Sequence, residues 1–86
     1  MALVLCEVSD GFRDSEATVG VRAFDGDEQF LRVERDFLTE NSGCYYLSVG
    51  LILKDQSGQF ALIELPHEAD SGAARLWVET ENLKHP

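Results

Sequence analysis

The chain has 86 residues, of which 44% are hydrophobic and 27% are charged, and its formal net charge is −9. This composition predicts a single folded domain over residues 1–86, and the length excludes a two-domain enzyme, a Rossmann unit with a substrate domain and a TIM barrel. Sixteen acidic residues face seven scattered basic ones, so we expect no binding to nucleic acid or to an anionic membrane, because both need clustered Lys and Arg.

The N-terminal segment Leu3–Val8 is apolar and β-branched enough to predict a first strand, and Ser9–Gly11 predicts the turn that follows. No basic region precedes the segment, and its apolar run stops at Glu7, so it does not resemble a signal peptide. We therefore expect a cytoplasmic protein with reduced thiols at Cys6 and Cys44. Their spacing matches no zinc pattern, and we expect both to be small packing residues, with Cys44 the more accessible.

Residues 17–24 alternate apolar and other side chains, which predicts a half-buried strand. Asp25–Asp27 indicates a hairpin turn into a second strand at Phe30–Arg35. A three-residue loop places Val21 opposite Leu31, whereas loops of two or four residues mix apolar and charged residues on each face. The pattern therefore favours an odd loop, Asp25–Asp27.

The segment Gln29–Leu38 also fits one face of a helix, capped by Asp25 or Asp27. The residues on that face are Phe30, Leu31, Val33, Phe37 and Leu38. We prefer the hairpin because the preceding strand needs a partner, and Asp36–Glu40 remains compatible with a short helical turn.

The strongest strand pattern is Tyr45–Leu53, in which apolar residues alternate along the segment. The turn Asp55–Gly58 leads into a strand that ends before Pro66, because proline cannot donate to a ladder. This turn places Leu53 opposite Phe60.

The chain closes with a loop at His67–Ala74, a strand at Arg75–Glu79 and a turn at Thr80–Leu83. The fold class is therefore all-β, with about six short antiparallel strands and at most one short helix or 3₁₀ turn. Strands of this length bury one core only by curling into a small barrel or a roll.

The segment Arg75–Leu83 resembles the end of bacterial SH3-like domains, in which a Gly-Trp-Val strand is followed by one 3₁₀ turn and a small apolar residue. Leu76 stands here where glycine is usual in those domains. The resemblance implies an SH3-like barrel, a fold that usually binds peptides, cell-wall fragments or other proteins. The tryptophan of an SH3 peptide groove lies elsewhere in that fold, so Trp77 does not inherit its role.

The loop before the last strand carries His67, Glu68 and Asp70, which are possible metal ligands or acid–base groups. A metal site needs convergent donors from more than one element, so we expect no metal and no cofactor, and we interpret Asp70 and Ser71 as turn formers. A dyad of His67 with Cys44 or Ser71 needs a water-shielded cleft, which a filled small barrel does not offer. We therefore expect no catalytic residues and no enzymatic activity.

Tyr45 and Tyr46 fall on opposite faces of their strand, so at least one ring points outward. The sequence leaves open whether Tyr46 and Trp77 lie in the core or on the surface, and it predicts an ion pair between Glu64 and Arg75 across the strands. The aromatic residues expected to complete the core are Phe30, Tyr45 and Phe60. The candidate partner-binding residues are Tyr46, Trp77, Arg75, His67, Glu68 and Asp70.

These observations predict a small acidic protein-binding or self-associating module that is not catalytic. Left at a sheet edge, Leu3–Val8 would template strand pairing, so a homodimer is one expected form. The alternative is an acidic DNA mimic that inhibits a nucleic-acid-binding protein. The carboxylates of that hypothesis are Asp25, Asp27, Glu28, Glu34, Asp36 and Glu40. A small metal protein or enzyme that uses the His67 loop is a third, less favoured hypothesis.

Overall fold

The computed structural model of the chain describes residues 2–11 and 13–85. Over these residues the fold is all-β, as the alternation predicts, with no α-helix. In chain order the elements are β1 (Ala2–Asp10), β2 (Glu16–Arg22), β3 (Glu28–Glu34), η1 (Arg35–Phe37), β4 (Leu38–Asn41), β5 (Cys44–Lys54), β6 (Phe60–Glu64), β7 (Arg75–Glu79), η2 (Thr80–Asn82) and β8 (Leu83–Lys84). The prediction of about six antiparallel strands is confirmed for the main sheet. Two short strands, β4 and β8, are added to it, and each follows a 3₁₀ turn, η1 or η2, where at most one such turn was expected.

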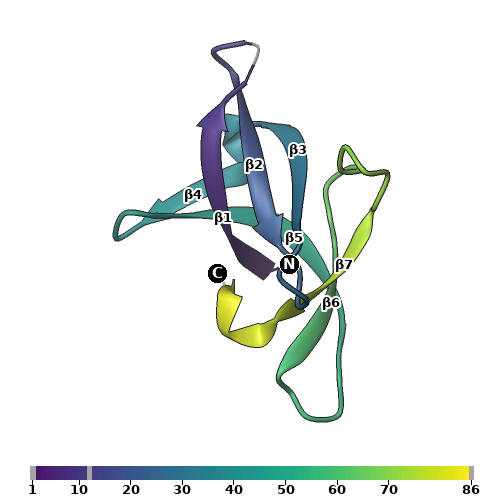
Figure 1. Cartoon of the computed structure of the whole chain (residues 1–86). Helices are drawn as coiled ribbons and strands as arrows, with labels where there is room; N and C mark the ends of the chain where they lie inside the picture. The colour runs from purple at the N-terminus through teal and green to yellow at the C-terminus, as the bar shows by residue number, and fades with distance from the viewer. Residues whose placement is uncertain (1, 12, 86) are drawn as a thin grey trace.

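Six of the strands form a strongly curled half-barrel in the order β3-β2-β1-β5-β6-β7, and every pairing is antiparallel (Figure 1). The long strand β5 connects the two halves of this sheet, because its first part pairs with β1 and its last part with β6. Strand β4 pairs with the first part of β5, and β8 pairs with β1.

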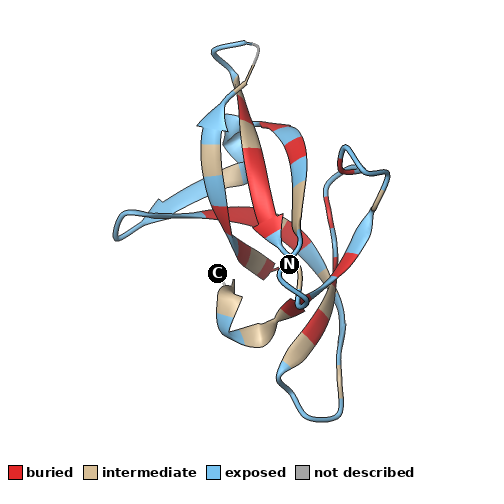
Figure 2. Ribbon diagram, in the orientation of Figure 1, coloured by how far each residue is buried: buried red, intermediate tan, exposed pale blue. Residues whose placement is uncertain are grey.

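The core fills the concave side of the sheet. Because side chains alternate along a strand, every second residue of the curled strands points inward. The largest fully buried side chains are Leu31, Leu47, Ile63, Val4, Val19, Val21 and Val78. Figure 2 shows that the longest buried run lies on β2, in the middle of the upper half of the sheet.

The β2–β3 segment is a hairpin, so the helical alternative for this part of the chain is wrong. Its register also differs from the prediction, because Leu31 lies opposite Val19 and not opposite Val21. The loop spans Ala23–Asp27, closed by a 2.7 Å hydrogen bond from the amide of Ala23 to the carbonyl of Asp27. This loop is still odd in length, so Val19 lies opposite Leu31 and Ala17 opposite Val33, whereas Val21 lies opposite Gln29.

The helical turn expected at Asp36–Glu40 is replaced by the 3₁₀ turn at Arg35–Phe37. From Leu38 onward the chain is extended, because it pairs with the first part of β5 and gains ladder hydrogen bonds there.

The turn at Asp55–Gly58 is confirmed by a 3.1 Å hydrogen bond from the Gly58 amide to the Asp55 carbonyl, with Gly58 at φ 75°. The predicted pairing of Leu53 with Phe60 is wrong, since Leu53 lies opposite Leu62. Asp55 itself continues the ladder, with its amide 2.9 Å from the Phe60 carbonyl, and a bulge shifts the register between Leu51 and Leu53.

Strand β1 lies inside the sheet, between β2 and β5, and not at the sheet edge on which the homodimer hypothesis depended. Its first part pairs with β5 on one side, while β8 and β2 occupy the other side. The first part of β1 therefore offers no long free edge on which a second copy could add a strand, whereas Glu7, Val8, Ser9 and Asp10 pair with β2 alone.

Candidate functional site

The outer face of β6 and β7 carries a row of exposed apolar side chains. Alternation turns Leu62 of β6 and Trp77 of β7 outward, because their sequence neighbours are buried. Leu53 of β5 lies opposite Leu62, and Leu62 lies opposite Trp77, so one row crosses three strands. Leu53 is 47% exposed and Trp77 is 36% exposed. Water-exposed apolar rows of this kind mark binding surfaces more often than isolated apolar residues do.

The loop between β2 and β3 adds Phe24 to this surface. The amide of Phe24 donates a 2.8 Å hydrogen bond to the carbonyl of Trp77. The Phe24 ring stands edge-on to the Phe60 ring, with centroids 5.9 Å apart and planes at 75°. Phe24, Asp55, Phe60 and Trp77 line a hollow of about 350 Å³, which we call the aromatic groove.

Phe24 is 52% exposed although its backbone is fixed on β7. Water-facing aromatic rings on a tethered backbone lose little conformational freedom on binding, which is the property of interface anchors. The aromatic groove is therefore the candidate functional site.

An oriented carboxylate lines one side of the aromatic groove. Asp55 accepts hydrogen bonds from the Ser57 hydroxyl, at 2.9 and 3.0 Å, and from the Phe60 amide, at 3.3 Å. Burial acts to raise the pKa of Asp55, but the hydrogen bonds from Ser57 and from backbone amides outweigh it and lower the pKa. The group is therefore a fixed anion at neutral pH, and no salt bridge in the described part of the chain engages it.

Two more carboxylates lie on the far side of Phe60. Glu79 is the cross-strand neighbour of Phe60, and with Glu81 it lines a second hollow of about 440 Å³. The side-chain hydrogen bond between Glu79 and Glu81, with burial and their mutual repulsion, raises the pKa of Glu79, and the charge of Arg22 opposes this. The aromatic groove therefore has carboxylates on two sides.

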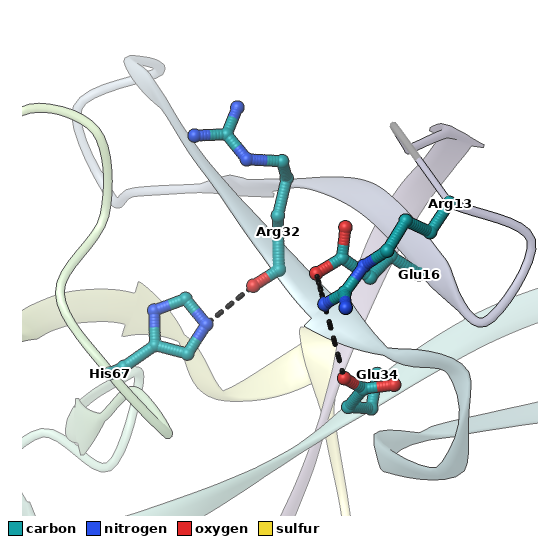
Figure 3. Close-up of polar contacts among 5 residues, drawn as sticks. All are labelled: Arg13, Glu16, Arg32, Glu34 and His67. Carbon is teal, nitrogen blue, oxygen red and sulfur yellow. Dashed lines mark hydrogen bonds and ion pairs between the residues drawn. The ribbon is translucent and has the colours of Figure 1, made fainter.

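The predicted site residues of the His67 loop do not line the aromatic groove. The loop that carries them contacts strand β3 instead. The His67 ring reaches the backbone carbonyl of Arg32 through Nε2 (Figure 3), while Nδ1 lies 3.0 Å from the Glu68 carbonyl. The Asp70 amide donates a 2.7 Å hydrogen bond to the Phe30 carbonyl. The loop thus fastens β6 and β7 to β3, and among the described residues no three side chains of metal-ligand type cluster.

The two remaining predicted site residues, Arg75 and Tyr46, differ in their surroundings. The guanidinium of Arg75 lies 3.4 Å from the Glu64 carboxylate, which confirms the predicted ion pair. Tyr46 is only 8% exposed, because Lys84 of β8 covers its ring with Nζ 4.8 Å from the centroid. Tyr46 therefore contributes little surface, and Trp77 is the exposed member of the predicted pair.

The expectation that Phe30 and Tyr45 complete the core is wrong, since they are 46% and 39% exposed. Phe30 lies opposite Gly20 on the outer face of β2, where a Cβ on the glycine would come within 3.0 Å of the ring. The ring thus covers a position that has no side chain. Tyr45 lies opposite Cys6 in the last β1–β5 pair. Beyond this pair the β4–β5 hairpin leaves the body of the sheet (Figure 1).

A separate hollow, of about 620 Å³, lies between β1, β2 and the start of β5, and both cysteines line it. Cys44 is exposed, as predicted, whereas burial raises the pKa of the Cys6 thiol to about 11. His67 is not among the lining residues, so the structure does not place the dyad of Cys44 and His67 in this hollow.

The carboxylates of the DNA-mimic hypothesis form two groups, one at each end of strand β3. A strand of this length spans roughly 20 Å. Asp25 and Asp27 precede β3, whereas Glu34 ends it. Figure 3 shows Arg13 between the Glu16 and Glu34 carboxylates, at 2.7 and 3.9 Å. This arrangement is not a continuous anionic row.

Sequence reasoning found Trp77 and missed Phe24 and Phe60 as surface anchors. One signal was present, because each phenylalanine directly adjoins a turn, and turns lie on the surface.

Within the described residues, no helix is long and apolar enough to span a lipid bilayer. Comparison of the chain with models of known families, with curated proteins and with solved structures finds no match.

Proposed function

We propose that this protein is a non-catalytic binding module that holds a protein partner in the aromatic groove. The observation that carries the proposal is the exposed pair of rings, Phe24 and Trp77, joined through a backbone hydrogen bond of 2.8 Å. Large aromatic side chains in a fixed, water-exposed setting supply most of the binding energy at many protein interfaces. The resemblance of Arg75–Leu83 to the end of bacterial SH3-like domains supports the same function, because that fold usually binds peptides or proteins.

Charge favours a different protein over a second copy as the partner. A symmetric dimer through the aromatic groove would bring Asp55, Glu79 and Glu81 of two copies together, and like charges across an interface cost several kcal/mol. The interior position of β1 also shortens the edge that favoured strand-to-strand pairing, because its first part is already paired with β5 and β8.

The test compares the proteins that the wild type and its variants capture from a lysate. Each variant is first shown by circular dichroism to be folded like the wild type. Trp77→Ser and Phe24→Ser remove the two rings, and Phe37→Ser removes a ring that is 42% exposed in η1. We expect the wild type and Phe37→Ser to retain the same partner and both groove variants to lose it. Retention of every captured protein by the groove variants would refute the proposal. Light scattering at high micromolar concentration should report a monomer.

A further inference from the structure

We propose that the occupant of the aromatic groove is an arginine-bearing apolar peptide segment of the partner. This inference rests on the proposed function and specifies its ligand. In the complex, a guanidinium lies against Trp77 within reach of Asp55 and of the Glu79–Glu81 pair, and an apolar side chain fills the space beside Phe24 and Phe60.

The charges around the aromatic groove favour a cation. Asp55 is held in place by Ser57 and lines the groove directly. Glu79 and Glu81 lie together beyond Phe60, so an incoming cation relieves their repulsion as well as forming new ion pairs. Lys54 is a neighbouring cation, and it lies opposite Ala61 in the β5–β6 pair. Because Ala61 points inward, Lys54 lies on the sheet face opposite to the groove.

The aromatic lining favours arginine in particular. A planar guanidinium stacks on an indole ring and at the same time offers paired N–H donors to carboxylates. Trp77 supplies the ring, Asp55 lines the same groove, and Glu79 lies two residues along β7 from Trp77, opposite Phe60. At about 350 Å³ the aromatic groove is at the small end of ligand pockets, which suits one or two side chains of a peptide.

A second copy of the chain is a poor source of this arginine, because most of its own arginines already have carboxylate partners. These pairs are Arg13 with Glu16, Arg32 with Asp70, Arg35 with Asp10 and Arg75 with Glu64. Arg22 adds its charge to the environment of Glu79. The ligand is therefore a segment of another protein.

The chain has a single tryptophan, Trp77, so its fluorescence reports on the aromatic groove directly. The probe is the blocked peptide Leu-Arg-Leu-Arg-Leu-Arg-Leu, and its matched control carries citrulline at each arginine, which keeps the shape and removes the charge. We expect the arginine peptide to change the Trp77 emission and to bind at least about tenfold more tightly than the citrulline peptide. Its affinity should fall as salt rises from about 0.05 M to about 0.5 M, because the attraction is screened.

One variant and one control test whether Glu79 and Glu81 are the carboxylates that bind the arginine peptide. The double variant Glu79→Gln/Glu81→Gln should weaken the arginine peptide several-fold and leave the citrulline peptide unchanged, whereas Glu40→Gln on β4 should alter neither. Circular dichroism of each variant confirms that the fold is kept. Loss of binding in Glu40→Gln to the same extent would overturn the placement of the ligand.

The outcomes separate this inference from the proposed function. Equal binding of both peptides, with a change in Trp77 emission, overturns the arginine and leaves the aromatic groove as the binding site. No response to either peptide, together with lysate capture that depends on Phe24, also overturns the inference while the proposed function stands. A concentration-dependent Trp77 emission without peptide would show a second copy in the groove and would overturn the inference too.

Discussion

The backbone amide of Phe24 lies 2.8 Å from the backbone carbonyl of Trp77, and this hydrogen bond joins the two ends of the curled sheet. A second such bond, 2.7 Å long, joins the amide of Asp70 to the carbonyl of Phe30. Loops thus close the half-barrel where β3 and β7 do not form a ladder with each other. The first of these hydrogen bonds also holds the backbone of Phe24 beside Trp77 in the aromatic groove.

Amide hydrogen exchange tests this closure. The Phe24 amide lies in a loop, yet we expect it to exchange at least tenfold more slowly than the same amide in an unfolded peptide, which corresponds to about 1.4 kcal/mol of opening free energy. It should still exchange faster than amides of the β1–β5 ladder, because opening the loop does not require global unfolding. Exchange at the unfolded rate, measured by NMR, would contradict the closure.

A matched pair of isoleucines tests the inward and outward faces. Ile63 is fully buried on β6, whereas Ile52 in the β5 bulge is 39% exposed. We expect Ile63→Val to lower the free energy of unfolding by about 0.5–1.5 kcal/mol and Ile52→Val to lower it by much less, because only the first leaves a cavity. Urea unfolding followed by circular dichroism measures both. Equal losses would mean that the bulge does not turn Ile52 outward.

The two thiols should differ in reactivity. Only the thiolate reacts with a disulfide reagent, and with a pKa of about 11 roughly one Cys6 side chain in a thousand is ionised at pH 8. We expect one fast thiol in the folded protein and two in denaturant. The variant Cys44→Ser should leave no fast thiol, whereas Cys6→Ser should keep it, since Cys44 is the exposed residue.

The Asp55 turn predicts a dependence of stability on pH. Hydrogen bonds lower the pKa of Asp55 in the folded state, so its carboxylate stabilises the fold above the ordinary aspartate pKa of about 3.9. That contribution is lost as the pH falls through the lowered pKa and the carboxylate is protonated. We expect Asp55→Ala to lower the urea midpoint at pH 7, and the difference from the wild type to shrink progressively below about pH 4. A difference that is constant down to pH 2 would show that the charge has no role.

Local patterns in the sequence determined the strands. Period-two alternation predicted strands β2 and β5, and the turn at Asp55–Gly58 followed from a glycine where a positive φ is needed. The Glu64–Arg75 pair was also predictable, because the positions flank one loop and end adjacent strands. These features depend on residues close together in the chain.

The surface assignment of the aromatic residues depended on tertiary structure. Tyr46 is buried because the end of the chain returns to β1 and places Lys84 over its ring, whereas Phe30 lies opposite Gly20 and keeps 46% of its surface exposed. Alternation assigns a side chain to one of two faces, but it does not say which outer-face positions another segment will cover.

The aromatic groove likewise depends on the tertiary structure. The amino-acid sequence was sufficient to predict an all-β chain with alternating faces and to name Trp77 as a candidate anchor, but the exposure of Trp77 came from the structure. Only the curled tertiary structure brought Phe24 of one hairpin beside Phe60 of another, because the bulge in β5 and the loop at Ala23–Asp27 set the registers. Register in each hairpin is decided by how hydrogen bonds and side chains fit across the whole sheet, and neighbouring residues along the chain carry only part of that information.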